Sequence, residues 1–392
     1  MITCLTPDLL RKRASGKWID FADDILPSNP AEMDFAIAEP ILKALQETID
    51  HQRFGYASQG DSGPVAKLKA SFQARMKAKF DWDVEAGHIL PVTNLVQAVA
   101  SLIAAFSEQG EGVSLQLPAY PMFLEAIRQT GRQAKANDML RLDGRYALDI
   151  DALEAQLTPD VKILLLCHPH NPTGRVFSKE ELEPLARLAK ERALLVISDE
   201  IHCDILFDGY RHTPFAKMFP ELCNQTVTLQ SASKSFNIPG LGCALMIFGS
   251  DSVKDHFAGR VPPMLLGHPG ISGIVGTTAA WQEGEPWFAD LMVQLQANRD
   301  LMARRFAQEL PEVVLIKPEA TYLAWADFSR CDLPSMPFEF LRDKARVVGG
   351  NGANFGPGYE QHVRFNFATS AAILNEKIDR IIRALLSNSK ES

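Results

Sequence analysis

Between residues 90 and 250, short and nearly continuous apolar runs alternate with segments of helical periodicity. The apolar runs occupy residues 112–117, 161–167, 194–198, 226–230 and 244–248. The helical segments occupy residues 94–106, 122–130 and 178–192, and the last begins with a capping pattern of Ser178 followed by Glu181. Strands that are apolar on both faces and alternate with helices favour a parallel sheet covered on both sides. The sequence therefore predicts an α/β fold.

Beyond about residue 285 the pattern changes to segregated strands and helices. A long helix is expected at residues 286–309, strands at 313–316, 322–326 and 362–367, and a last helix at 372–386. We expect a large α/β domain with a mostly parallel sheet over residues 46–284 and a smaller α+β domain over residues 285–392. The N-terminal segment, residues 1–45, is expected to join the smaller domain. The glycine-rich residues 349–358 are interpreted as a mobile active-site loop.

Composition narrows the possible partners. The chain of 392 residues has a net charge of −8, so no cationic excess is available to hold a nucleic acid. Its apolar runs are far shorter than a membrane span, and no secretory signal is apparent. None of its six cysteines forms a CxxC pair, which is typical of buried thiols in a reducing compartment. We expect a cytoplasmic protein that binds neither nucleic acid nor membrane.

Polar residues stand where the predicted strands end. Tyr120 follows the first run, Asn171 the second, Asp199 and His202 the third, and Ser231, Ser233 and Lys234 the fourth, while Thr93, Asn94 and Leu95 open a predicted helix. Ligands of open α/β sheets bind beyond the carboxyl ends of the strands. These residues are therefore expected to converge on one site.

The residue types in this group form a coherent set for one kind of cofactor. Lys234, among small hydroxyl residues, can form a Schiff base if its surroundings keep the amine partly neutral. Asp199 can pair with a pyridinium nitrogen, and Asn171 can bond a phenolic oxygen. Tyr120 can stack on an aromatic ring. The helix that begins near Asn94 offers free N–H groups and a positive dipole end to a phosphate.

Three sequence clusters carry a family resemblance. They are Asn171-Pro172-Thr173-Gly174, Ser198-Asp199-Glu200-Ile201-His202 and Ser231-Ala232-Ser233-Lys234. They resemble the fold-type I pyridoxal-phosphate (PLP) enzymes of the class I/II aminotransferase superfamily. Segments at residues 32–35, 55–56, 118–120, 234–241, 321–325 and 363–366 are more similar to the MalY/PatB-like cystathionine β-lyase branch. The resemblance implies the aspartate aminotransferase-like fold and pyridoxal 5'-phosphate as cofactor.

The resemblance also implies a role for each residue. Lys234 would carry the cofactor as an internal aldimine and act as the base at Cα, with Asp199 and Tyr120 as its catalytic partners at the ring. The remaining cofactor ligands would be Thr93, Asn94, Leu95, Asn171, His202, Ser231 and Ser233, with Tyr56 contributed by a second subunit of a homodimer. The substrate would contact Arg364, Asn171, Asp34 and Phe35, with Arg364 holding the α-carboxylate of a small amino acid.

The sequence departs from the family pattern at two places near the expected site. Many members of the superfamily have an arginine eight residues after the lysine as a phosphate partner, whereas this chain has Gly242. The lyase branch usually has Trp-Val-Ala-Asp where this chain has Asn29-Pro30-Ala31-Glu32. The first departure leaves the neutralisation of the phosphate open, and the second leaves the side chain of the substrate open.

Two other kinds of site are not favoured. Cys167, His168, His170 and His202 lack the spacing of a zinc site, so no metal is expected. The glycines of residues 240–245 have a leucine at the third small position of a dinucleotide fingerprint, and no strand leads into them.

Three functions remain at this point. The first is a C–S β-lyase that eliminates the thiol from an S-substituted L-cysteine and yields pyruvate and ammonia. The alternative is an aminotransferase on an L-amino acid, in which Lys234 returns the proton to the cofactor. The third is a ligand-sensing domain that binds the cofactor without turnover.

Overall fold

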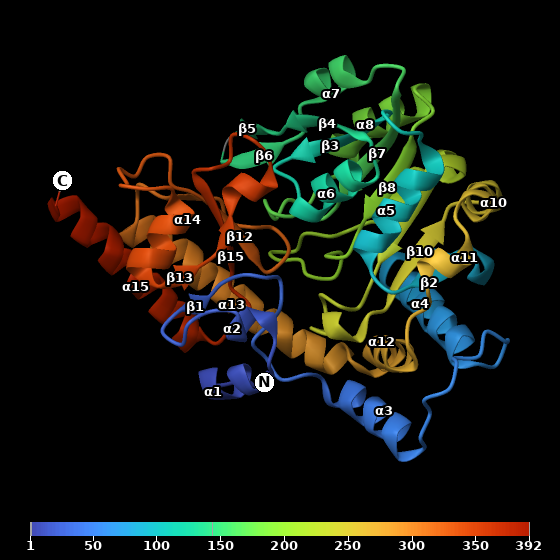
Figure 1. Ribbon diagram of the computed structural model, residues 1–392, viewed down its shortest axis with the longest axis horizontal. Helices are drawn as coiled ribbons and strands as arrows, with labels where there is room; N and C mark the ends of the chain where they lie inside the picture. Colours follow the sequence, from blue (N-terminus) through green and yellow to red (C-terminus); the bar gives the residue numbers. More distant parts are fainter. Residues whose placement is uncertain (1, 143, 392) are drawn as a thin grey trace.

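The large domain is built on a seven-stranded sheet. The computed structural model describes residues 2–142 and 144–391. The strands follow the order β2-β10-β9-β8-β7-β3-β4 (Figure 1). Their bounds are β2 Ile89–Val92, β3 Gly112–Leu117, β4 Gln133–Asp138, β7 Val161–Cys167, β8 Leu195–Asp199, β9 Thr226–Gln230 and β10 Ala244–Phe248. Only β10 runs antiparallel to its neighbours in this sheet, so the prediction of a mostly parallel sheet is confirmed.

Helices cover this sheet and frame its edges. They are α3 Glu39–Asp50, α4 Pro64–Phe80, α5 Leu95–Phe106, α6 Pro121–Gln129, α7 Ile150–Gln156, α8 Lys179–Glu191, α9 Phe215–Met218, α10 Asp251–Arg260, α11 Pro263–Leu266 and α12 Ile271–Glu283. The capping box predicted from Ser178 and Glu181 opens α8. Helix α5 packs across β2, β7, β8, β9 and β10, and its apolar face lies in the main core. Its N-terminus is thereby fixed at the carboxyl ends of the strands.

The smaller domain holds a four-stranded antiparallel sheet of order β11-β12-β15-β14. Its elements are α13 Glu285–Glu309, β11 Val314–Leu315, β12 Leu323–Asp327, α14 Pro337–Phe340, β13 Val347–Val348, β14 Gly350–Asn351, β15 His362–Asn366 and α15 Ala371–Glu391. Phe306, Phe328 and Phe365 form part of its own buried core. The prediction of an α/β fold with a smaller α+β domain is confirmed. The hairpin β5 Leu140–Leu142 and β6 Arg145–Ala147 was not predicted.

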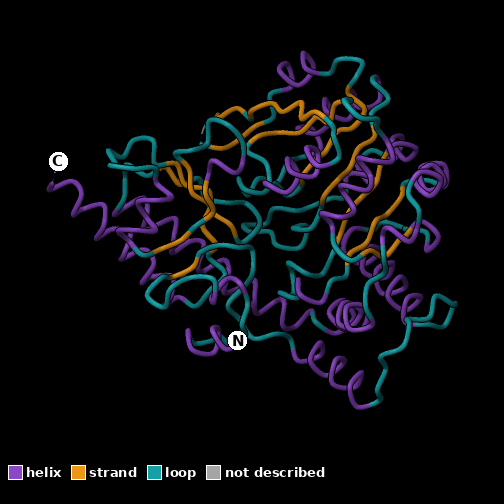
Figure 2. The backbone as a smooth tube through the Cα atoms, in the orientation of Figure 1, coloured by secondary structure: helices purple, strands orange, loops and turns teal. Residues whose placement is uncertain are grey.

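The N-terminal segment lies against the smaller domain. It contains α1 Pro7–Lys12, α2 Gly16–Ile19 and β1 Leu26–Pro27, and β1 pairs in parallel with β13. In Figure 2 the loops between the two sheets gather where this segment meets both domains. The expected division at residue 45 falls inside α3, which packs against α12 of the large domain. Among the described residues, no helix combines the length and apolar character needed to cross a membrane.

Candidate active site

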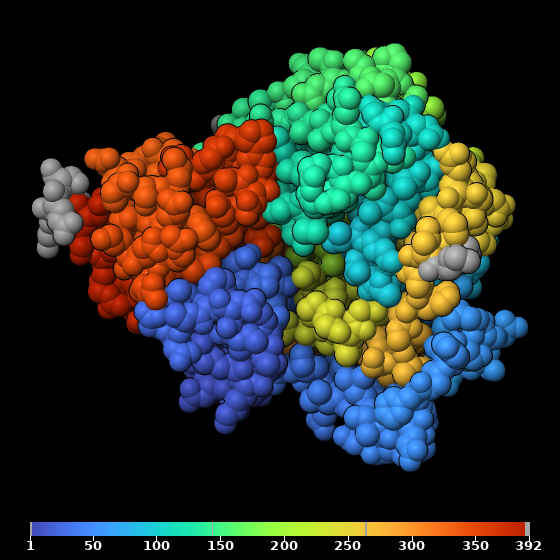
Figure 3. Space-filling view, viewed as in Figure 1, coloured from blue at the N-terminus to red at the C-terminus, as the bar shows by residue number. Residues whose placement is uncertain are grey.

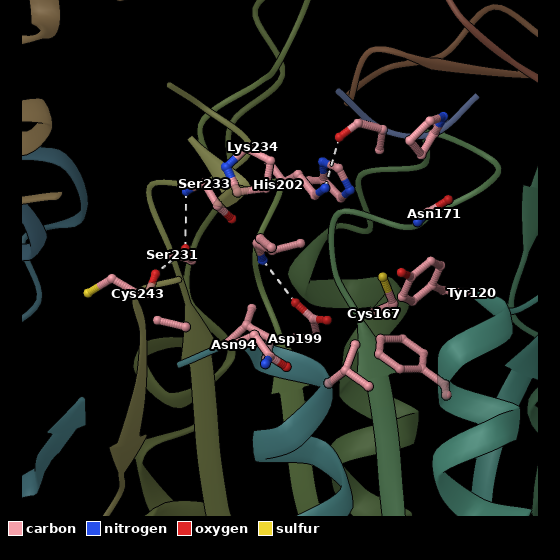
Figure 4. Close-up of a pocket in the computed structure, with 18 of the residues that line it drawn as sticks. Asn94, Tyr120, Cys167, Asn171, Asp199, His202, Ser231, Ser233, Lys234 and Cys243 are labelled. Carbon is pink, nitrogen blue, oxygen red and sulfur yellow. Dashed lines mark hydrogen bonds between the residues drawn. The ribbon is translucent and has the colours of Figure 1, made fainter. Parts of the chain in front are cut away.

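The carboxyl ends of the central strands open into a cavity of about 220 Å³ between the two domains. Figure 3 shows the surface hollowed where the N-terminal segment, the smaller domain and the large domain meet. Most residues expected from the sequence line this cavity: Thr93, Asn94, Leu95, Tyr120, Asn171, Asp199, His202, Ser231, Ser233, Lys234 and Arg364. Figure 4 shows that those it labels, among them Asn94, Asp199 and Lys234, come from different elements and face a common space.

Lys234 presents an amine that is easier to deprotonate than a surface lysine. Its Nζ donates a hydrogen bond to the carbonyl oxygen of Ala31 at 2.8 Å. Burial, followed by the positive charge of Arg364, lowers the pKa of Lys234 to about 8, although the charges of Glu32 and Asp199 oppose this. An appreciable fraction of the amine is therefore neutral near pH 8 and available as a nucleophile or a base.

Asp199 ends β8 and is buried beneath the cavity. Burial raises the pKa of Asp199 to about 7, and the charge of Glu200 adds to the increase. The N–H of Ile201 donates to Oδ1 of Asp199 at 3.0 Å and, with the charge of Lys234, works in the opposite direction. A cationic ring nitrogen placed over this carboxylate would supply the charge that the buried group lacks.

Arg364 on β15 brings a buried positive charge to the other side of the cavity. Its Nη1 donates to Oδ1 of Asn171 at 3.0 Å, and its Nη2 donates to Oδ1 of Asn29 at 2.8 Å. Burial lowers the pKa of Arg364 to about 10, and the described residues supply it with no carboxylate partner. Because both acceptors are neutral amides, the guanidinium is well suited to an incoming carboxylate.

The N-terminus of α5 and the loop after β9 form the phosphate-binding candidate. Asn94 caps α5 by accepting the N–H of Gln97 at 2.9 Å. Ser231 Oγ donates to the carbonyl of Cys243 at 2.7 Å and accepts the N–H of Ser233 at 3.1 Å. A helix of twelve residues directs its free N–H groups and positive dipole end toward this part of the cavity. The site therefore offers neutral donors and a helix dipole to an anion.

Tyr120 and His202 flank the cavity as uncharged rings. Burial raises the pKa of Tyr120, and its ring meets that of Phe123 edge-on, with the centroids 5.4 Å apart. Burial and then the charge of Lys234 lower the pKa of His202 to about 3, so this imidazole is neutral at physiological pH. Its Nδ1 has no hydrogen-bond partner among the described residues. Tyr120 is thus available for ring stacking and His202 for a further hydrogen bond.

Comparison with known proteins agrees with this geometry. The family described as aminotransferase class I and II matches residues 32–385. The chain belongs to this family. It is 35% identical to "Cystathionine beta-lyase PatB" of Bacillus subtilis over 92% of this chain and 93% of that protein. The resemblance inferred from the motifs is therefore confirmed.

Solved structures also superpose on nearly the whole chain. The crystal structure of OvoB is 34% identical, with a TM-score of 0.89, over 95% of this chain and 96% of that chain. The structure described as "a putative plp-dependent beta-cystathionase" from Corynebacterium diphtheriae is 28% identical, with a TM-score of 0.92, over 98% of this chain and 99% of that chain. These likenesses confirm the aspartate aminotransferase-like PLP fold.

Two residues expected to contact substrate lie elsewhere in this member of the family. Asp34 is buried in an ion pair with Lys17 at 2.9 Å and accepts a hydrogen bond from Trp18 Nε1 at 2.8 Å. Phe35 lies wholly in the core of the smaller domain. Neither side chain lines the cavity, so both are corrected from substrate ligands to supports of the N-terminal segment.

The same stretch of chain nevertheless reaches the site through residues that were not predicted. Pro30 and Ala31 line the cavity, and Asn29 contacts Arg364. Other unpredicted lining residues are Val96, Phe123, Cys167, Ile201, Pro239, Cys243 and Ala244. For Asn29, Pro30 and Ala31, the only signal in the sequence was that residues 29–32 differ from the lyase branch. That signal indicated the segment but not which of its residues contact the site.

Two further expectations concern Tyr56 and the glycine-rich residues 349–358. Tyr56 is fully exposed and does not line the cavity of its own chain. The glycine-rich residues 349–358 contain β14 and the 3-10 turn Gly352–Phe355. The ring of Phe355 is buried, and its centroid lies 5.0 Å from the guanidinium carbon of Arg364. This stretch therefore forms part of the wall behind Arg364.

Proposed function

We propose that the chain is a PLP-dependent C–S β-lyase that cleaves S-substituted L-cysteines to a thiol, pyruvate and ammonia. The observation that carries the proposal is one cavity that joins Lys234, with a pKa lowered to about 8, to the buried Asp199 and to Arg364, which has no carboxylate partner among the described residues. The similarity to cystathionine β-lyases over nearly the whole chain supports the C–S bond as the one that breaks.

The residues present fit the cofactor. Lys234 would hold its carbonyl carbon, Asp199 its ring nitrogen and Asn171 its ring oxygen, with Tyr120 against the ring face. The phosphate would bind at the N-terminus of α5, helped by the hydroxyls of Thr93, Ser231 and Ser233. When bound, the cofactor supplies a ring that accepts the electron pair left at Cα.

The phosphate can be bound without an arginine at position 242. Gly242 has a positive φ of 60°, a conformation that favours glycine, and a Cβ there would come to 3.7 Å from the carbonyl oxygen of Thr93. The phosphate charge would then be met by the helix dipole and backbone N–H groups rather than by a side-chain cation.

The chain's own residues account for the steps of the elimination. Arg364 binds the α-carboxylate and holds the amino acid in the cavity that Lys234 lines. The neutral amine of Lys234 takes the Cα proton, the Cβ–S bond breaks, and the thiolate leaves with the bonding electrons. Aminoacrylate released in this way takes up water to give pyruvate and ammonia.

We further propose a cytoplasmic homodimer in which Tyr56 completes the neighbouring cavity. Tyr56 is fully exposed, and Phe54 beside it is 68% exposed, so two aromatic rings stand in water on one loop of a single chain. A second copy would cover them. A monomeric mass for the active protein, measured by light scattering, would exclude this arrangement.

The decisive experiment gives the purified holoenzyme L-cystathionine without any keto acid. Pyruvate and free thiol are followed over many turnovers. Sustained release of both products is expected for a lyase. A single stoichiometric conversion that resumes only after a keto acid is added would replace the proposal with an aminotransferase. Binding of L-cystathionine without any product would indicate a sensor or a different substrate.

A further inference from the structure

The residue of interest is Asn29, whose side chain reaches the guanidinium of Arg364. Nη2 of Arg364 donates to Oδ1 of Asn29 at 2.8 Å, and Nη1 donates to Oδ1 of Asn171 at 3.0 Å. The two amides approach from different parts of the fold, because Asn171 follows β7 and Asn29 follows β1. A bond at each terminal nitrogen fixes both the direction and the plane of the guanidinium.

The main chain on both sides of Asn29 is tied to the strand that carries Arg364. The carbonyl of Ser28 accepts the N–H of Asn366 at 2.8 Å, and Ser28 Oγ donates to the carbonyl of Asn366 at 2.9 Å. The carbonyl of Pro30 accepts Nδ2 of the same asparagine at 2.7 Å. Asn29 is therefore linked, through the residues on either side of it, to the same strand that carries Arg364.

The neighbouring strand leaves room for this pair. A Cβ at Gly350 would lie 3.5 Å from Oδ1 of Asn29 and 3.5 Å from Nε of Arg364. Any larger side chain at residue 350 would compete for the space that the amide and the guanidinium occupy. The tightest contact of that Cβ would be with Cβ of Arg364, at 3.3 Å, so the glycine gives the pair room.

The charge of the acceptor is as important as its position. A guanidinium has five N–H donors, and the two amide oxygens each accept one. An amide oxygen directs a guanidinium without neutralising it, whereas a carboxylate in the same place would form an ion pair and compete with an incoming anion. Arg364 is consequently oriented and still carries an uncompensated positive charge inside the cavity.

We propose that Asn29 is a positioning residue for the α-carboxylate of the substrate, acting by orienting Arg364 while leaving its charge free. The inference rests on the proposed function only in that Arg364 binds that carboxylate. Asn29 itself contacts neither the reacting atoms nor the base. It sets the affinity for the carboxylate and leaves the chemical step at Lys234 unaltered.

The test compares Asn29→Asp and Asn29→Ala with the parent holoenzyme. Asn29→Asp is expected to raise KM for L-cystathionine about tenfold or more, because the new carboxylate pairs with Arg364. Asn29→Ala is expected to raise KM about three- to tenfold, since one orienting bond is lost. In both variants kcat is expected to change less than about threefold.

Two simple ligands separate positioning from a general structural role. Butyrate carries only a carboxylate, and ethylamine carries only an amine. Both ligands are used as competitive inhibitors. The inhibition constant of butyrate is expected to rise in parallel with KM in both variants, while that of ethylamine stays within about twofold of the parent value. These measurements need only a displaced ligand or a spectral change, so they also apply if the holoenzyme proves to be an aminotransferase.

Asn375→Asp is the matched control. Asn375 accepts a hydrogen bond from Nη1 of Arg305 at 3.1 Å, which is the same amide–guanidinium contact at a place outside the cavity. This variant is expected to keep the parent values. Unchanged KM in both Asn29 variants, or an equal loss of butyrate and ethylamine binding, would overturn the inference. A parent enzyme that binds no butyrate would overturn it too, and would also remove the carboxylate role of Arg364, whereas the lyase assay tests the reaction independently.

Discussion

The cavity has two walls that are held in place by different means. One wall consists of strand ends of the large domain, where the ladder of β7 and β8 sets Cys167 beside Asp199. The other is residues 28–35, called here the N-terminal strap, of which Pro30 and Ala31 line the cavity. The first wall is positioned by many main-chain bonds shared among strands, whereas the second has no ladder along its length.

Apart from main-chain bonds near its two ends, at Ser28 and Asp34, the strap is held by individual side chains. Asn237 donates to the carbonyl of Met33 at 2.9 Å and accepts its N–H at 2.8 Å. Lys17 and Asn366 both donate to the carbonyl of Glu32, at 2.8 and 2.7 Å. A substitution in the sheet wall should therefore alter the reaction without moving the wall. A substitution that frees the strap should instead shift the position of the strap in the cavity.

The largest effect is expected from Lys234→Ala in the sheet wall. Loss of the amine removes the base and the covalent attachment of the cofactor, so activity should fall at least about a thousandfold. The visible absorbance band of the bound cofactor should shift or disappear. Because no strand bond is lost, the melting temperature of the cofactor-free protein should change little. Lyase assays, absorbance spectra and thermal melts check these outcomes, and a retained band with retained activity would contradict the site.

Asp199→Asn, in the same wall, should lower activity while raising stability. Activity should fall about a hundredfold, because an amide cannot stabilise a protonated ring nitrogen. The cofactor-free protein should gain stability, because burial raises the pKa of Asp199 to about 7 from about 4 in the unfolded chain.

The effect of Asp199 on stability depends on pH. Between pH 4 and pH 7 the folded protein binds more protons than the unfolded chain at Asp199, so its stability falls as pH rises. Asp199→Asn should remove this fall and add up to about 4 kcal/mol to the free energy of unfolding at pH 8, with little gain at pH 4. Urea unfolding of the cofactor-free proteins at both pH values measures the difference. An equal effect at both would contradict the assigned burial of the charge.

The contrast between the sheet wall and the N-terminal strap also explains which parts of the site could be predicted from the sequence. The strand-end residues were predictable because strands such as β7 and β8 are apolar on both faces, and parallel topology brings their carboxyl ends together. Strand β4 and the β5–β6 hairpin were missed because their largely exposed sequences, Gln-Ala-Lys-Ala-Asn-Asp among them, carry no continuous apolar run. Edge strands are stabilised by one ladder and need little apolar character.

The strap was placed near the site but with the wrong side chains facing it. Asp34 was expected at the substrate, yet its partner Lys17 lies on α2 and turns the carboxylate into the protein. The orientation of the strap depends on Asn237 and Asn366, which are more than 200 residues away in sequence. Local patterns hold no information about such contacts, so the neighbourhood was predictable and the facing residues were not.

Asn237→Ala tests the strap directly. The N–H and C=O of buried Met33 would both lose their partner, so the free energy of unfolding should fall by about 2 kcal/mol. Because Ala31 and Asn29 precede Met33 on the strap, KM for L-cystathionine should rise about three- to tenfold.

A buried asparagine outside the cavity provides the control for this variant. Nδ2 of Asn298 donates to the carbonyls of Phe367 and Thr369 at 2.9 and 2.6 Å, within the smaller domain. Asn298→Ala should lower the free energy of unfolding by a similar amount and leave KM unchanged. Chemical unfolding and steady-state kinetics measure both quantities. If both variants raise KM alike, the strap is not held independently of the domain.

The smallest effect is expected beneath the strap, at Lys377. Its Nζ is buried without a hydrogen-bond partner among the described residues. Burial, followed by the charge of Lys17, lowers the pKa of Lys377 to about 7, and Asp34 opposes this. In the unfolded chain the pKa is about 10. Unfolding therefore takes up a proton between pH 7 and pH 10, and the cost of burying the charge is greatest below pH 7.

Lys377→Met should relieve that cost while leaving Lys17 to pair with Asp34. The free energy of unfolding should rise at pH 6, and the gain should shrink toward zero near pH 10. KM should stay at the parent value, because the bonds from Lys17 to the strap remain. Unfolding curves across this pH range, with kinetics at pH 8, make the comparison. A gain that does not vary with pH would point to packing alone, and a raised KM would show that the strap depends on this lysine as well.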